Sequence, residues 1–99
     1  MNVIEKNQGP KINYVVDGNK ITFGDDEITL NLIKYERDDA QTIDICRDDE
    51  KILIAGPSKY FVANIDIPAR EYEDDEKTIP VPFSMDNVTL TLWALVEVE

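Results

Sequence analysis

The stretch "KINYVVDGNKITFGDDEITLNL" (residues 11–32) contains three runs in which apolar and polar residues alternate, separated by two turn sequences. In the first run Ile12, Tyr14 and Val16 fall on one face, as expected for a strand whose successive side chains point to opposite sides. The tripeptide "DGN" after this run supplies residues that tolerate positive φ. The stretch therefore predicts a β-hairpin followed by a third strand.

The period of two continues along the rest of the chain. The predicted strands span residues 11–16, 20–23, 27–35, 42–47, 51–55, 59–67 and 87–98. The segment 27–35 changes phase at Ile33, which indicates a bulge or a crossing between sheets. In the segment 59–67 the alternation places Phe61, Ala63, Ile65 and Ile67 on one face.

Short strands at regular spacing, without a helical period, favour one all-β domain over residues 1–99. We expect an antiparallel β-sandwich of about seven or eight strands, Ig-like or jelly-roll-like, with a small barrel as the alternative. Residues 69–80 are polar and acidic, and Pro68 precedes them. Because proline cannot donate a ladder hydrogen bond, Pro68 is expected to end the strand before it or to bend it at an edge. The polar segment that follows is predicted to be the longest loop.

The composition limits the classes of partner. The chain has 21 acidic and 10 basic residues and a net charge of −11, so a nucleic acid or an anionic membrane is not expected to bind it. A protein partner or self-association is expected, and a charged partner should present a basic surface. No apolar run approaches the ~20 residues of a membrane span, so we expect a cytoplasmic protein.

The residue inventory also argues against catalysis. The chain has no histidine and a single cysteine, Cys46. This excludes His-dependent catalytic triads and the usual zinc sites, and Cys46 fits a packed or shielded thiol better than a nucleophile. We predict no enzymatic activity, no cofactor, and no catalytic or metal-binding residues.

Four acidic turns carry Asp-Asp pairs and hold twelve of the 21 carboxylates. They lie at residues 24–27, 37–40, 47–50 and 73–76. None fits an EF-hand loop, but a composite cation site could form if two turns met at one end of the sandwich. The other interpretations are solvated turns and a docking surface for a basic partner. The longest run is a candidate interaction surface and consists of Glu73, Asp74, Asp75 and Glu76.

Aromatic and neighbouring apolar residues supply the second candidate surface. Tyr60, Trp93 and Leu95 lie on strand faces with mixed neighbours. Trp93 is either a core residue between the sheets or, with Leu95, part of an exposed interface, where Trp and Tyr are enriched. Exposed aromatic side chains would also suit stacking on a sugar.

Three stretches carry a resemblance to known proteins. They are "GPKINYVVDGNKITFGDD" (residues 9–26), "FVANIDIPAREYE" (61–73) and "VPFSMDNVTLTLWAL" (81–95). The chain resembles small β-rich proteins encoded by bacterial phages and prophages. That resemblance implies no catalytic residues, and it suggests a particle or tail component, located in the virion, or an accessory protein of the infected cell.

Three functional hypotheses follow. The first is a non-enzymatic structural or protein-interaction module, in a tail or capsid accessory role, that uses a sheet edge or the region of Trp93. The second is an acidic decoy that occupies a nucleic-acid-binding protein, and it requires the Asp-Asp turns to lie in a row on one surface. The third is a ligand- or sugar-binding β domain with exposed aromatic side chains.

Overall fold

The computed structural model describes residues 1–95 and is all-β. The strands are β1 (Asn2–Glu5), β2 (Tyr14–Asp17), β3 (Lys20–Phe23), β4 (Ile28–Asn31), β5 (Gln41–Arg47), β6 (Leu53–Ala55), β7 (Tyr60–Ile67) and β8 (Thr89–Leu92). Two short 3₁₀ helices are η1 (Leu32–Tyr35) and η2 (Met85–Asn87). The prediction of a strand at residues 96–98 falls outside the described residues.

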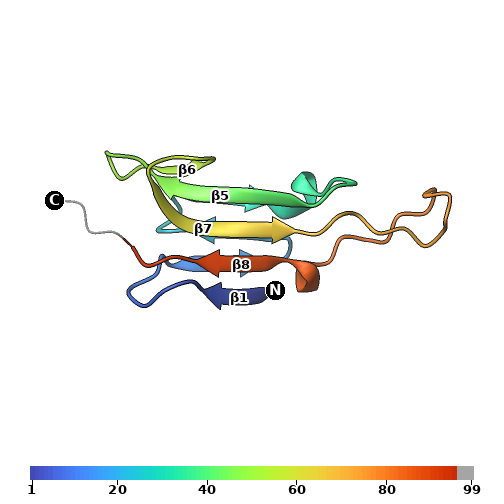
Figure 1. The fold of residues 1–99 in the computed structure, drawn as a ribbon, viewed down its shortest axis with the longest axis horizontal. Coiled ribbons are helices and arrows are strands. Elements are labelled where there is room, and N and C mark those ends of the chain that lie inside the picture. The colour runs from blue at the N-terminus through green and yellow to red at the C-terminus, as the bar shows by residue number, and fades with distance from the viewer. Residues whose placement is uncertain (96–99) are drawn as a thin grey trace.

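The strands form two sheets that pack face to face, and this confirms the predicted sandwich over the alternative small barrel. Residues 1–95 form a five-stranded sheet of order β1-β8-β7-β5-β6 and a three-stranded sheet of order β2-β3-β4 (Figure 1). All pairs are antiparallel except β1 with β8, which is parallel.

The hairpin that opens the sequence is present in the predicted place. Asp17 pairs with Lys20 across a two-residue turn in which Gly18 has a φ of 59°. A side chain other than glycine would be strained in that conformation. The third strand, predicted to reach residue 35, ends at Asn31 because the chain enters η1. The phase change at Ile33 therefore marks a 3₁₀ turn, and the predicted bulge or crossing in this segment was wrong.

A β-bulge in β7 changes which side chains enter the core. Ile45 of β5 pairs with Ala63, and the next residue, Cys46, pairs with Phe61, so Val62 is the extra residue. Val62 and Ala63 are consequently both buried, and Phe61 is exposed on the opposite face. The predicted face of residues 61, 63, 65 and 67 is correct for the last three and wrong for Phe61.

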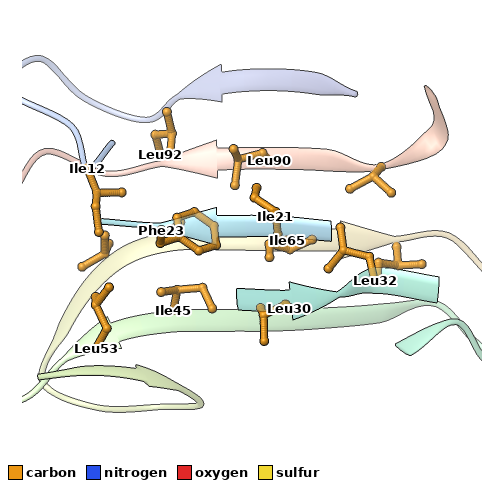
Figure 2. Packing of buried hydrophobic residues seen from close by; sticks show 14 residues of the cluster. Ile12, Ile21, Phe23, Leu30, Leu32, Ile45, Leu53, Ile65, Leu90 and Leu92 are labelled. Carbon is orange, nitrogen blue, oxygen red and sulfur yellow. The ribbon is translucent and has the colours of Figure 1, made fainter. Parts of the chain in front are cut away.

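The core lies between the two sheets. Its buried cluster combines alternate residues of β3 and β8, four residues of β7, and single residues of β4, η1, β5 and β6 (Figure 2). Ile21 and Phe23 from β3 face Ile65 from β7 and Leu90 from β8, and all four side chains are fully buried. Burial of such side chains contributes roughly 1.5–3 kcal/mol each and is the main favourable term in folding.

The acidic segment predicted as a loop forms a projecting arm, which we define as residues 68–83. The arm leaves the end of β7 and returns to η2, and it extends the molecule along its longest axis (Figure 1). Its two sides are joined by a bridge between Tyr72 and Pro80 and by the hydrogen bonds Glu73 N to Ile79 O and Val81 N to Glu71 O, both 2.8 Å. The molecule measures 54 × 22 × 20 Å.

Candidate functional site

The candidate site lies on the outer face, defined as the face of the five-stranded sheet directed away from the three-stranded sheet. Leu90 and Leu92 point into the core from β8, so Trp93, which follows β8, turns to the outer face. The bulge at Val62 turns Phe61 to the same face, and Trp93 N donates to Val62 O at 3.0 Å. The bulge therefore brings two aromatic side chains together.

These side chains form an aromatic cluster of Phe61, Trp93 and Lys6. The Phe61 and Trp93 rings are stacked, with centroids 5.5 Å apart and an interplanar angle of 26°. The Lys6 ammonium lies 5.7 Å from the Trp93 ring centroid, a cation–π distance. Lys6 reaches this position because Lys6 N donates to Leu92 O at 2.8 Å, which continues the β1–β8 pairing.

The close approach of residues 6–10 to the end of β8 requires a glycine. Ala94 N donates to Asn7 Oδ1 at 2.7 Å, and Leu95 N donates to Pro10 O at 2.7 Å. Gly9 lies between these contacts with a φ of 131°, and a Cβ atom there would meet Ala94 Cβ at 2.9 Å. The segment can follow β8 only without a side chain at this position.

A row of polar side chains on β7 and β5 continues the cluster. Trp93 Nε1 donates to Asn64 Oδ1, and Asn64 Nδ2 donates to Asp44 Oδ1 at 2.8 Å. Next to this row Thr42 Oγ1 donates to Asp66 Oδ1 at 2.7 Å. The indole nitrogen therefore has its partner, and the Trp93 ring is held in place by hydrogen bonding, stacking and a cation.

Phe61 is the apolar side chain that the cluster offers to solvent. It is 43% exposed, whereas Trp93 is half-buried beneath its neighbours. Ile54, which faces the same side from β6, is 36% exposed. An exposed phenyl ring on a fixed indole, bordered by polar side chains, has the composition of a protein-binding surface.

The other two residues predicted with Trp93 lie elsewhere. Tyr60 precedes Phe61 and pairs with Arg47, so it points to the opposite face of the sheet from Phe61. Leu95 packs against the core cluster and lines a shallow depression together with Lys11 and Arg47. Trp93 is thus an outer-face residue, and neither Tyr60 nor Leu95 shares that face.

The acidic run lies at the tip of the arm, away from the aromatic cluster. Asp74 caps the turn: its carboxylate accepts from Ile79 N at 3.0 Å, from Thr78 N at 2.9 Å and from the Thr78 hydroxyl. These bonds, above all the one from the Thr78 hydroxyl, lower the pKa of Asp74. Glu73, Asp75 and Glu76 are exposed. One member of the run therefore has a structural role.

The four acidic turns form two pairs at opposite ends of the molecule. The turn 24–27 meets the turn 47–50 through Arg47, whose Nη2 lies 3.2 Å from Glu27 Oε2. The turn 37–40 lies at the base of the arm, where Arg70 contacts Glu36 and Asp38. The run 73–76 is at the arm tip. The turns do not form the single row that the acidic decoy requires.

The two turns that meet at one end do not assemble a cation site. Glu27 is paired with Arg47, and Asp49 is paired with Lys59 at 2.7 Å. Asp48 Oδ1 accepts from Glu50 N and Ile52 N at 2.8 and 3.0 Å and so caps its own turn. Within residues 1–95 no group of three Cys, Asp or Glu side chains could hold a metal ion.

Cys46 is buried outside the main core cluster. It pairs with Phe61 on one side and Ile54 on the other, and the short connection from β6 to β7 crosses β5 at this level. Burial raises the pKa of the thiol, a hydrogen bond from the Ser58 backbone opposes that shift, and Asp44 adds to it. The side chain is a shielded thiol on the outer side of β5.

Sequence reasoning missed Phe61, Lys6 and Asn64 as members of the site. Phe61 was assigned to the core by alternation, and nothing in the chain marks the bulge except two consecutive small apolar residues, Val62 and Ala63. Lys6 lies in a segment for which no strand was predicted. The sequence indicated that aromatic side chains could form a surface. Which residues belong to the cluster depends on the pairing register of β5 with β7.

Comparison with known proteins gives no relative. No protein-family model matches the chain, and neither the curated proteins nor the solved structures contain a match. In the part of the chain that the structure describes, every helix is too short to cross a membrane.

Proposed function

We propose that this protein is a non-enzymatic interaction module that binds a partner protein through the aromatic cluster on its outer face. The observation that carries the proposal is the exposed Phe61 ring stacked on Trp93 at 5.5 Å. Rigid aromatic anchors surrounded by polar groups are the usual centres of binding energy in protein interfaces. The phage resemblance adds a setting, a tail or capsid accessory component, in which such a module would join neighbouring proteins.

The aromatic cluster suits a protein better than a sugar. A sugar platform needs an open ring face, but the Trp93 ring already has Phe61 stacked on it and the Lys6 ammonium 5.7 Å from its centroid. The indole N–H, which could bind a hydroxyl, already donates to Asn64. What the cluster presents is an apolar ring and a cation, which fit an apolar side chain and a carboxylate of a protein partner.

The proposal is tested by identifying and then measuring the partner. Benzoylphenylalanine at position 61 would photocrosslink the partner in host extract, and the same residue at position 33, an exposed apolar site on η1, is the control. The partner is then expressed and its affinity measured by calorimetry. We expect Phe61→Asp to weaken binding by more than about tenfold and Ile33→Asp to leave it unchanged.

Two results would contradict the proposal. If Phe61→Asp and Ile33→Asp bound the identified partner equally well, the aromatic cluster would not be the interface. If a glycan panel gave saturable heat that Trp93→Ala removed, the sugar-binding hypothesis would replace it. Folding of both variants is checked by circular dichroism before binding is compared.

A further inference from the structure

The two sheets have unequal widths, and one side of the sandwich lacks a strand. Val3 of β1 lies beside Leu90 of β8 and points to the same side, yet Leu90 is fully buried and Val3 is 45% exposed. Val16 of β2 lies beside the fully buried Ile21 of β3 and is 40% exposed. The three-stranded sheet therefore ends opposite β8, and β1 extends beyond it.

The backbone of β2 is unpaired on this side. Gly24 N donates to Asn13 O at 2.8 Å, and Asp17 pairs with Lys20 across the two-residue turn, so residues 13, 15 and 17 direct their N–H and C=O groups to β3. Tyr14 and Val16 direct theirs to the opposite edge. No hydrogen bond within residues 1–95 reaches that edge. The edge also has no proline or lysine of the kind that blocks strand addition.

We propose that an extended segment of a partner protein occupies this position as a fourth strand, antiparallel to β2 and covered by β1. The strand would hydrogen-bond to Tyr14 and Val16, and its inward side chains would meet the exposed valines of both sheets. We call this position the β1–β2 edge. It is formed by Val3, Glu5, Tyr14 and Val16 and is separate from the aromatic cluster, so the two proposals stand or fall independently.

The chemistry of the β1–β2 edge changes along its length. In Figure 2, Leu92 and Phe23 lie to the left of Leu90 and Ile21. Val3 and Val16 lie beside Leu90 and Ile21, whereas Glu5 and Tyr14 lie beside Leu92 and Phe23. One end of the β1–β2 edge is therefore apolar, and the other offers a carboxylate and a phenol hydroxyl.

This arrangement defines the occupant. A strand antiparallel to β2 passes Val16 before it passes Tyr14, and alternate residues of a strand face the same side. An apolar residue would fill the valine end, and a lysine or arginine two positions later would reach Glu5. A basic segment also fits the net charge of −11.

A second copy of the chain does not fit the same position. Antiparallel pairing of two β2 edges would place a two-fold axis perpendicular to the three-stranded sheets. Both five-stranded sheets would then lie on one side, and each β1 would occupy the place of the other copy's β8. The like charge of two chains at −11 opposes this association further.

The test uses a synthetic peptide, acetyl-Thr-Val-Thr-Val-Thr-Arg-Thr-amide, and a control in which glutamate replaces the arginine. Titration of ¹⁵N-labelled protein is followed by NMR. We expect the arginine peptide to shift the amides of residues 2–5 and 14–17 and to slow hydrogen exchange at Tyr14 and Val16. The glutamate peptide should bind about fivefold more weakly, near the upper end of the range for an exposed ion pair.

Two variants make the assignment specific. Val16→Lys places a cation at the β1–β2 edge and should abolish binding, whereas Ile33→Lys, on the exposed face of η1, should not change it. Glu5→Lys lies on an exposed strand and should reverse the preference, so that the glutamate peptide binds better than the arginine peptide. Because the reversal is a gain of binding, loss of fold cannot imitate it.

The proposal is overturned by any of three results. The first is equal binding of the two peptides to the wild-type protein. The second is a set of amide chemical-shift changes at residues 73–76 and none at residues 14–17. The third is the absence of binding at millimolar peptide concentration. Concentration-dependent dimerisation that protects Tyr14 and Val16 without peptide would show a second copy at the β1–β2 edge and would equally overturn the proposal.

Discussion

At the scale of single residues, the acidic turns are explained first by the backbone and only then by charge. Asp74 and Asp48 both accept hydrogen bonds from N–H groups later in their own turns. Aspartate is frequent in turns for this reason, so the residue type at these positions could be predicted from the sequence. The sequence does not predict which aspartate of each pair caps the turn, because that choice depends on the backbone conformation of the turn.

Replacing Asp74 should loosen the tip of the arm without affecting the sandwich. In Asp74→Ala we expect faster hydrogen exchange at the amides of Thr78 and Ile79, because both lose their acceptor. Asp75→Ala is the control, since Asp75 is exposed and adjacent to the cap. Equal exchange in the two variants would show that the carboxylate does not order the tip.

The same carboxylate gives a pH dependence with a definite sign. The pKa of Asp74 is lower in the folded arm than its ordinary value of 3.8, so the charged form is the one that the arm stabilises. Its contribution is therefore complete above that value and is lost as the pH falls through the lowered pKa. NMR exchange at Thr78 should accelerate relative to its intrinsic rate in this acidic range, and Asp74→Asn should remove the step.

Cys46 should be unreactive while the protein is folded. The side chain is fully buried and burial raises its pKa, so both access and thiolate fraction are low. We expect a thiol reagent such as DTNB to react on the order of a hundredfold more slowly than in urea, because reaction requires local opening. Cys46→Ser/Thr42→Cys, with its thiol at an exposed position, is the control and should react at once.

At the scale of elements, alternation located most strands but not the departures from regular pairing. The hairpin of β2 and β3 could be predicted because its turn residues and its period agree. β1 was missed because all four of its residues are exposed, so no apolar face marks it. The bulge at Val62 was missed because a strand's period carries no signal for one inserted residue.

The bulge predicts opposite outcomes for two neighbouring substitutions. Val62→Asp would bury a carboxylate among core residues at a cost of several kcal/mol and should prevent folding. Phe61→Asp changes a half-exposed residue and should cost about 1 kcal/mol, the scale of its stacking on Trp93. Urea unfolding followed by circular dichroism measures both. If the side chains alternated regularly from residue 61 to 67, Phe61 would lie in the core, and Phe61→Asp would be the less stable variant.

At the scale of the whole molecule, the sequence is sufficient for the sandwich but not for its sheet order. Period-two runs with turn signals between them leave few architectures other than two packed sheets. The parallel pairing of β1 with β8 joins residues 2–5 to residues 89–92, and no local pattern encodes a contact of that range. The outer-face cluster depends on this pairing, since it brings Lys6 to Trp93. The candidate site was therefore less predictable than the fold.

The charge of the molecule sets its response to salt. The chain carries a net charge of −11, whereas residues 1–95 form only four ion pairs, and none of these pairs is fully buried. Repulsion among unpaired carboxylates should thus outweigh the attraction within the pairs, and added salt screens both. We expect NaCl to raise the free energy of unfolding by about 1 kcal/mol between low salt and half-molar salt.

A charge-reduced variant separates screening from a general effect of salt on apolar burial. Asp75→Lys and Glu76→Lys each remove one negative and add one positive charge, which together bring the net charge from −11 to −7 at the exposed arm tip. Because repulsion grows with the product of the charges, this variant should be more stable at low salt and respond less to NaCl. Urea unfolding at several salt concentrations measures both quantities. If NaCl raised the free energy of unfolding equally in the two proteins, the salt response would come from apolar burial. If NaCl lowered it, the ion pairs at the two ends of the sandwich would dominate the electrostatics.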